Sequence, residues 1–562
     1  MVLGAAALIG WFYLSPRIMP QAPTSPDTAE VQAATPASTA TNQAAAANAT
    51  AETVKPVTAV VMANLPEVVL KNQDAKYSIQ PVTGAITKVV FSDKFHKKDS
   101  NEPLAINMVD GALGLRGENC TINTVKVLSS KLTQDGKYLL SRLMRDSFGN
   151  EFTVNSEYAL QGKYQLQLKM QIKNSSQREM MLPALLIPAG GLQQWHRLSG
   201  DAASRAQELH TVEYCTVSGK VKNENANADN DDWNELNGQP VRWMGVANRF
   251  FAQLLKGGEN LQMQLARTVA EPGAADYNVF VSGKMDSGKL TVGGTKDVQI
   301  YYYLGPKQPK ALRDFDKAGS KVMHLGWFPI DFLAYIMLAV LNWLYSFVGS
   351  FGWSIILLTL LVRTLFFPIT MKANASMREM SALSPKLKEI REKYKDEPMV
   401  AQSKMQELYR EHKVNPVSGC LPMLIQIPVF IALYYALGSA AELRMQSFWW
   451  IKDLAQPDTV AVIFGLPLNP LIIVWTLLMV VQQKLTPTAM DPTQAKVMLI
   501  MPLVMLFFLY TLPAALTLYW TTSQIYSIAQ MLYQNKLKKR DESRRASDSD
   551  SKPAAKPRAV RS

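Results

Sequence analysis

The apolar stretch at residues 353–370 sets the first constraint on this chain, because it is long enough to cross a lipid bilayer and holds an arginine near its middle. It reads WSIILLTLLVRTLFFPIT, and no acidic residue within it can neutralise Arg363. A guanidinium at mid-membrane depth costs about 3 to 10 kcal/mol or more, depending on how much water reaches it. Lys372 lies about 13 Å further along a helix, so Arg363 is too deep to reach the interface easily. The charge therefore indicates a functional site inside the membrane.

Apolar residues are spread unevenly along the 562 residues and divide the chain into zones. Residues 1–14 contain an apolar run too short for a full spanning helix, which we interpret as an uncleaved N-terminal membrane anchor, with a cleaved signal core as the alternative. Residues 15–57, rich in Ala, Thr, Pro and Gln, predict a flexible linker. A polar zone follows at 58–322, and the remainder is a membrane region with a basic tail.

The polar zone shows the period-two alternation of half-buried strands. In 164–173 the apolar residues Tyr, Leu, Leu, Met and Ile alternate with Gln and Lys, and similar runs (AITKVVF, EFTVNSEYAL, KLTVGG, VQIYYYLG) are separated by turn signals such as Asp135-Gly136. This pattern predicts a β-sandwich. Cys120 and Cys215 also lie here; they could pair in an oxidising compartment, but two free thiols are the favoured interpretation.

Motifs for covalent chemistry are weak or missing. Residues 283–290 (GKMDSGKL) have the spacing of a phosphate-binding loop, but Leu290 stands where a magnesium-ligating hydroxyl is required, so a β-turn is the better interpretation. The five histidines are scattered, and neither HExxH nor GxSxG occurs. We therefore expect no enzyme, and no metal or cofactor.

Six apolar segments are candidate spans: 328–348, 353–371, 419–441, 466–484, 497–512 and 514–533. Charge decides among them, since positive loops stay in the cytoplasm. The loop 372–417 carries ten Lys or Arg against seven acids, and the tail 534–562 carries ten against four. If 353–371 enters from outside, every basic segment is cytoplasmic and the β zone is extracytoplasmic. Residues 328–348 then fit an interfacial helix within 323–350, with a sixth span as the alternative.

The membrane core at 351–533 is thus expected to be an all-α bundle of five helices. Its loop 372–417 predicts a cytoplasmic helical hairpin, because apolar residues recur at three- and four-residue intervals on both sides of a turn at Asp396-Glu397-Pro398. Pro385 should start a new turn or kink the first helix. A solvated two-helix coiled coil is the simplest interpretation of the hairpin; adaptable contact of its methionines with varied apolar segments is the alternative.

Polar residues within the other spans cluster at Gln426, at Gln482 and Gln483, and at 521–524. If they face Arg363, they line a wet recess that opens to the cytoplasm. For any single one of them, an interhelical hydrogen bond that only joins helices is an equally good explanation.

Four segments resemble the YidC/Oxa/Alb insertase family: NPVSGCLPMLIQIPVFIALYYAL (415–437), LVRTLFFP around Arg363, LTPTAMDPTQAK (485–496) and LYWTTSQIYSIAQ (518–530). The β zone, including WMGVANRFFAQLL (243–255), looks like the periplasmic domain of YidC in Gram-negative bacteria. One departure is Gln524, where the family usually has Asn.

The resemblance implies a cofactor-free insertase of the bacterial inner membrane that places nascent membrane proteins into the bilayer, alone or with the Sec translocon. It implies a hydrophilic groove formed by Arg363, Gln426, Trp520, Ser523 and Gln524. It also implies an apolar slide along which client helices leave, made of Ile427, Pro428, Phe507 and Phe508. The basic tail predicts contact with anionic lipids, with the ribosome as a second candidate partner. The rival functions are a small-solute transporter and a scaffold for membrane-protein folding.

Overall fold

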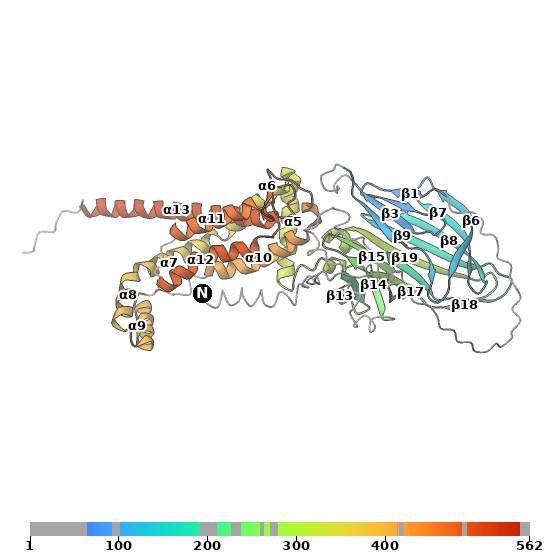
Figure 1. Ribbon diagram of the computed structural model, residues 1–562, viewed down its shortest axis with the longest axis horizontal. Helices are drawn as coiled ribbons and strands as arrows, with labels where there is room; N and C mark the ends of the chain where they lie inside the picture. Colours follow the sequence, from blue (N-terminus) through green and yellow to red (C-terminus); the bar gives the residue numbers. More distant parts are fainter. Residues whose placement is uncertain are drawn as a thin grey trace, which may run out of the picture.

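The computed structural model describes residues 65–92, 102–190, 211–225, 238–258, 263–269, 279–412, 414, 421–485 and 492–550. A β-rich domain lies at one end of the molecule and a helical bundle at the other (Figure 1). The predicted N-terminal anchor, the linker and Cys420 lie outside the described residues.

The β domain contains a small and a large antiparallel sheet. The small sheet has the order β1-β2-β3-β4 (Val68–Lys71, Ala75–Ile79, Ile86–Phe91, Ala105–Ala112). The main path of the large sheet runs β5-β11-β17-β16-β14-β15-β19-β9-β8-β7-β6 (Arg116–Gly117, Leu185–Gly190, Val279–Met285, Met263–Val269, Pro240–Ala247, Phe251–Gly257, Thr295–Pro306, Gln165–Asn174, Glu151–Leu160, Tyr138–Asp146, Ile122–Leu132). Off this path, β12 (Thr211–Thr216) pairs with β13 (Val221–Asn225) and β14, while β10 (Met180–Leu182) pairs separately with β18 (Gly288–Leu290).

The small sheet covers part of the large sheet, the arrangement expected of a sandwich. Phe91 of β3 contacts Tyr164 and Phe251 of the large-sheet region, with ring centroids 5.9 and 5.2 Å apart. Tyr77 donates its hydroxyl to the carbonyl of Leu304, 3.5 Å away. Residues of both sheets belong to one continuous apolar core.

The period-two pattern predicted the strands well. In β9, Leu166, Leu168, Met170 and Ile172 are all buried. Tyr164 lies just before this strand with φ 57°, so it belongs to the preceding turn. Asp135 and Gly136 form the turn between β6 and β7, where the glycine has φ 75°. The phosphate-loop lookalike is divided between β17 and β18, which pair with different strands and are joined by two residues without a regular turn. Cys120 and Cys215 are free; Cys215 is buried and Cys120 is half-buried.

A short connector joins the β domain to the bundle. It consists of α4 (Pro309–Phe315) and the 3-10 helix η3 (Gly319–Met323). Asp316 caps this connector and forms ion pairs with Arg242 of β14 (2.5 Å) and Lys256 of β15 (3.0 Å). The two cations lower the pKa of Asp316, although burial of the carboxyl opposes them. The connector is thereby fixed to the large sheet.

The bundle contains α6 (Phe351–Leu365), α7 (Phe367–Ala382), α10 (Leu421–Ser439), α11 (Pro470–Leu485), α12 (Pro492–Leu509) and α13 (Ala514–Asp550). In contrast, α5 (Ile330–Val348) runs across their direction in Figure 1 and packs against α6 and α10. By length and composition α5 could cross a membrane, as could α6 with α7 if that bent pair is one span. The apolar parts of α10, α11 and α12 are shorter.

The structure of residues 372–412 differs in one respect from the expected hairpin. Its first helix is divided: α7 continues α6 after a 57° bend, and α8 (Ser384–Lys393) begins separately, with Pro385 in its first turn. The expected turn precedes α9 (Pro398–Glu411), and α8 packs against it through a small cluster that includes Leu383, Leu387 and Val414. Therefore α8 and α9 alone form the hairpin.

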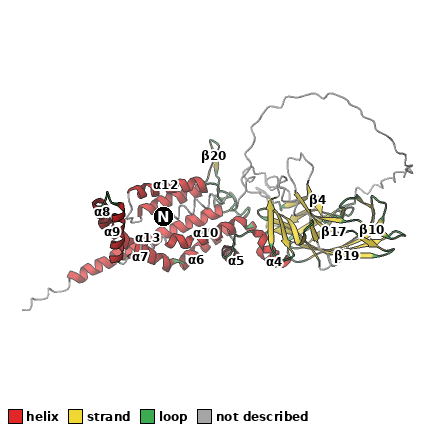
Figure 2. Ribbon diagram, turned by 90° about the horizontal axis from the view of Figure 1, so that it is seen from below, coloured by secondary structure: helices red, strands yellow, loops and turns green. Residues whose placement is uncertain are grey.

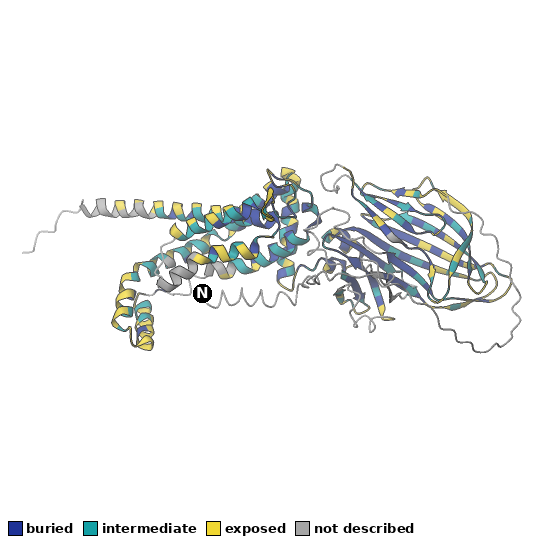
Figure 3. Ribbon diagram, viewed as in Figure 1, coloured by how far each residue is buried: buried dark blue, intermediate teal, exposed yellow. Residues whose placement is uncertain are grey.

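Burial differs between the two ends of the molecule (Figure 3). The strands are mostly buried, whereas the bundle helices expose many residues. Large apolar side chains are exposed on three of these helices, α6, α11 and α12: Leu357, Leu361, Leu365, Val474, Leu477, Leu503 and Phe507. An exposed surface of this composition suits hydrocarbon rather than water.

Candidate functional site

Arg363 lies in the last turn of α6, immediately before the bend at Phe366. Its side chain is half-buried, and its Nε donates a hydrogen bond to the Ser523 hydroxyl of α13. Within the part of the chain that the structure describes, no carboxylate forms an ion pair with Arg363. The guanidinium is therefore held by a neutral group and has no counter-ion among the described residues.

One face of α13 collects polar partners from three other helices. Residues four apart lie on one helix face, which places Tyr519 next to Ser523. The Tyr519 hydroxyl accepts a 2.7 Å hydrogen bond from Nε2 of Gln426 on α10. On α11, the amide oxygen of Gln482 accepts a hydrogen bond from Nε2 of Gln524. Polar side chains of α6, α10, α11 and α13 are thus connected at one level of the bundle.

Trp520 forms an aromatic wall next to these polar groups. Its ring stacks on Phe430 of α10 and on Trp475 of α11, with centroid distances of 5.2 Å in both cases and interplanar angles of 27° and 28°. The two contacts hold α10, α11 and α13 together through large apolar surfaces. All five predicted groove residues, Arg363, Gln426, Trp520, Ser523 and Gln524, therefore take part in interhelical contacts.

A polar seam between α7 and α13 continues from this cluster and was missed in the sequence. Gln530 donates a 2.9 Å hydrogen bond to Thr370, and Gln534 accepts hydrogen bonds from Arg378 and from Asn374 (3.4 Å). The spacing of Ser523, Gln530 and Gln534 along one helix face was a usable signal. This spacing alone does not distinguish a polar seam from an ordinary helix end, because polar residues are common near the ends of spans.

The predicted slide residues lie on two helices. On α10, Ile427 is half-buried and Pro428 is exposed inside the helix. On α12, Phe507 and Phe508 are 79% and 50% exposed, and their rings contact each other edge to face at 5.6 Å. These four side chains offer apolar surface, but they are not part of the hydrogen-bonded cluster.

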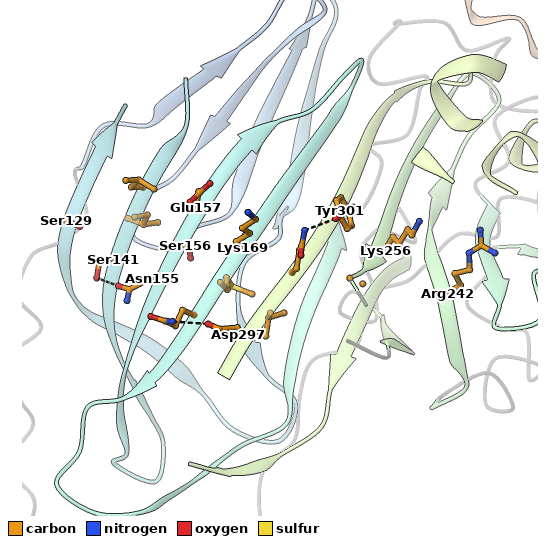
Figure 4. Close-up of a pocket in the computed structure, with 18 residues that line it drawn as sticks. Ser129, Ser141, Asn155, Ser156, Glu157, Lys169, Arg242, Lys256, Asp297 and Tyr301 are labelled. Carbon is orange, nitrogen blue, oxygen red and sulfur yellow. Dashed lines mark hydrogen bonds between the residues drawn. The ribbon is translucent and has the colours of Figure 1, made fainter. Parts of the chain in front are cut away.

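The β domain has its own cleft, about 1140 Å³ in volume, over strands β7, β8, β9, β15 and β19 (Figure 4). Its charged lining residues include Glu157, Lys169 and Asp297. Both carboxylates have partners: Glu157 pairs with Lys137 at 2.9 Å, and Asp297 accepts a 3.0 Å hydrogen bond from Gln171. The described residues also contain no group of three potential metal ligands. The cleft thus has the polarity of a binding surface and no evident catalytic group.

Two family models match consecutive parts of this chain. Residues 124–340 match the YidC periplasmic domain, and residues 343–542 match the 60Kd inner membrane protein model. The boundary between them falls within α5. The first match covers the β domain from β6 onward, without the small sheet, and the second covers the helical bundle.

Curated relatives carry the name membrane protein insertase YidC. One from Pelobacter propionicus is 38% identical over 305 residues (53% of this chain, 54% of the relative), and one from Chlorobium limicola is 32% identical over 365 residues (61% and 60%). The chain spans little more than half the length of these relatives. Among solved structures, an active YidC insertase is 19% identical, with a TM-score of 0.34 over 83% of this chain and 92% of that one. Since the two models together account for most of residues 124–542, the chain belongs to the YidC family of inner membrane proteins.

Proposed function

We propose that this protein is a membrane protein insertase, which inserts newly made proteins into the inner membrane through a hydrophilic groove. The observation that carries the proposal is the environment of Arg363: a hydroxyl partner, no ion-paired carboxylate among the described residues, and further polar groups from α10, α11 and α13. The names of the relatives support it.

The proposed mechanism uses solvation instead of covalent chemistry. A polar client segment crosses the bilayer more easily when polar side chains and water replace part of its hydration shell. Because no carboxylate among the described residues forms an ion pair with it, Arg363 attracts acidic segments in particular. Gln426, Ser523 and Gln524 supply uncharged hydrogen-bonding groups, and Trp520 forms the wall of the groove. Apolar client helices leave along Ile427, Pro428, Phe507 and Phe508.

We propose that five spans cross the membrane, formed by bent α6/α7, α10, α11, α12 and the first part of α13. The β domain is then periplasmic, and the hairpin α8–α9 and the C-terminus are cytoplasmic. The crosswise direction of α5 supports an interfacial helix rather than a sixth span. Its exposed aromatic residues, Phe332, Trp343 and Phe347, suit the outer membrane interface.

Reconstitution in liposomes tests the function directly. A client with an acidic translocated tail is offered to the pure protein, and protection of the tail from added protease is measured. We expect protection with the wild type, a large loss with Arg363→Ala, and little change with Arg410→Ala, which removes an exposed arginine from α9. Normal insertion of the tail by Arg363→Ala would overturn the role of the groove charge. No protection by the wild type would favour the folding scaffold.

The rival transporter and the partners need separate tests. Uptake of a small solute by liposomes without any client would favour the transporter. The helix α13 continues through the basic segment after Gln534, so the tail can reach beyond the headgroups to either anionic lipid or ribosomal RNA. If a chain lacking 535–562 still cosediments with ribosomes, lipid contact alone explains the tail. Cooperation with the Sec translocon is tested by adding the translocon to the same liposomes.

A further inference from the structure

A short hairpin between α10 and α11 carries Phe464, the most exposed large apolar side chain among the described residues. It consists of β20 (Ala461–Ile463) and β21 (Leu466–Leu468). Phe464 at its tip is fully exposed, Leu466 is 71% exposed and Val462 is 66% exposed. No charged residue occurs between Thr459 and Pro470. A protrusion of this composition is unfavourable in water and needs an apolar environment.

The tip has an unusual turn. Ile463 pairs with Leu466, which leaves Phe464 and Gly465 as a two-residue loop with φ of 51° and 80°. Such a turn favours Asn-Gly or Gly-Gly, since a bulky side chain at positive φ is strained by about 1 kcal/mol. The chain therefore has an aromatic side chain at a position where Asn would cause less backbone strain. This points to a role for the Phe464 ring itself.

The base of the hairpin is firmly held. Asp458 accepts hydrogen bonds from the Trp450 indole (3.1 Å) and from the backbone N–H of Leu471 (2.7 Å). Asn469 donates a 2.8 Å hydrogen bond to the carbonyl of Tyr510 at the end of α12, and the Tyr510 hydroxyl donates to the carbonyl of Pro467. An isolated two-stranded hairpin is only marginally stable, so these contacts fix the direction in which the tip projects.

The hairpin projects across the axes of the bundle helices. Figure 2 shows the hairpin leaving the bundle across the helix direction, at the end of the bundle that faces the β domain. Four residues of strand from Val460 to the tip reach about 13 Å beyond the base. The exposed Trp449 lies in the same connecting segment, and α11, which begins at Pro470 directly after the hairpin, exposes Val474 and Leu477. Tryptophan near the end of a span is typical of the membrane interface.

We propose that the β20–β21 hairpin inserts into the outer leaflet of the bilayer beside α11 and α12, with Val462, Ile463, Phe464 and Leu466 among the lipid chains and glycerol groups. The occupant is lipid because the surface is continuous with the lipid-facing side of the bundle, carries no charge to select a polar partner, and projects in the plane of the membrane. The proposal rests on the topology proposed above, but it does not require insertase activity.

Spin-label accessibility tests the proposal on the full chain in nanodiscs of phosphatidylethanolamine and phosphatidylglycerol. The native Cys120, Cys215 and Cys420 are first replaced by Ser or Ala. A label is then attached at Phe464→Cys, or at Asp135→Cys as the control, because Asp135 lies on an exposed polar hairpin tip of the β domain. We expect the label at 464 to collide less often with a water-soluble nickel chelate than the label at 135 does. We expect it to collide more often with oxygen, which is concentrated in the bilayer.

A second label site separates lipid contact from misfolding of the tip. In chains carrying Val462→Cys, the further change Phe464→Asn suits the turn and should preserve the hairpin, but should raise nickel collisions at 462. Nickel collisions at 464 as frequent as at 135 would overturn the proposal. So would a label at 464 that becomes shielded only when a client or another membrane protein is added. Because the readout needs no insertion, loss of insertase activity alone leaves the proposal intact.

Discussion

At the scale of single residues, the main feature is a half-buried cation, Arg363, held by a hydroxyl. A hydrogen bond to a charged group contributes about 1.5 to 3 kcal/mol, much less than full desolvation of a guanidinium costs. Ser523 therefore orients Arg363 but does not neutralise it. This combination leaves the charge available to a client.

Replacing Ser523 by Ala tests whether Ser523 orients Arg363 without neutralising its charge. The charge remains, but Nε loses its acceptor, so we expect the initial rate of tail protection in liposomes to fall several-fold, less than in Arg363→Ala, with little change in thermal stability. Ser527→Ala is the matched control, because the Ser527 hydroxyl donates only to the backbone carbonyl of Ser523 one turn earlier. An equal loss in both variants would show that the effect lies in the helix and not in the contact with Arg363.

A second residue-scale prediction concerns Lys307, a buried lysine close to the bundle. Burial lowers its pKa from 10.5 to about 8, although the charge of Glu213 opposes the shift. Between pH 8 and 10.5 the unfolded chain therefore binds a proton that the folded chain has released. The free energy of unfolding should rise with pH in this window, by at most roughly 1.4 kcal/mol per pH unit.

Lys307→Met should flatten this rise, whereas Lys310→Met removes an exposed lysine and should leave it unchanged. Urea unfolding of the β domain within the detergent-solubilised chain, followed by circular dichroism at several pH values, measures the slope. The same slope in wild type and Lys307→Met would contradict the assignment.

Polar side chains in apolar spans are costly and therefore informative, and the residues predicted on this basis to line a groove make contacts between helices. Arg363 and Ser523, predicted to face each other, are in contact. Tyr519 was missed, because an aromatic residue in an apolar helix has the same pattern as a packing residue, and only the structure reveals its hydroxyl bonded to Gln426. The groove function itself stays a prediction.

At the scale of elements, hydropathy located the helices better than their ends. The apolar run continues past residue 366, but Pro368 has no N–H to donate to the carbonyl of Thr364 four residues earlier, and α6 gives way to α7 at this point. Conversely, α13 extends far beyond its apolar part to Asp550, because no Gly or Pro interrupts its polar continuation. The apolar pattern therefore predicts whether a segment faces lipid or water. The positions of Pro and Gly determine where a helix breaks.

The contact between α6 and the loop after α10 yields a prediction at this scale. A Cβ on Gly352 would lie 2.1 Å from the ring of Phe448, which also packs against Trp353. Gly352→Ala should therefore displace that ring and lower the free energy of unfolding by about 1 to 3 kcal/mol. Gly438→Ala is the control, since a Cβ there meets nothing within 4 Å and alanine favours the helix α10. Thermal unfolding in detergent compares the two; equal midpoints would refute the close contact.

At the scale of the whole molecule, two kinds of contact link the β domain with the bundle. The connector is tied to the sheet through Asp316, and Arg249 reaches directly from the β domain to the bundle. The sequence distinguishes the two parts because strand-like polar alternation gives way to long apolar segments. It contains no signal for these contacts. They join residues far apart in the chain, such as Arg249 and Gly438, without any periodic signal.

Arg249 is the residue with which to test how firmly the two parts are joined. Its Nε donates a 2.7 Å hydrogen bond to the carbonyl of Gly438 in the last turn of α10, where the helix dipole favours a cation, and its guanidinium lies over the Phe250 ring. Arg249→Ala should therefore loosen the β domain relative to the bundle while both parts stay folded.

Distances between spin labels at Val217→Cys in the β domain and Lys452→Cys in the bundle loop, in the cysteine-free chain, measure this directly by pulsed electron resonance. We expect a broader distribution in Arg249→Ala and an unchanged one in Lys310→Ala, which removes an exposed lysine from the helix α4. If the distribution stays narrow without Arg249, the connector alone fixes the domain. If it is already broad in the wild type, the contact with Gly438 does not hold the two parts together in the membrane.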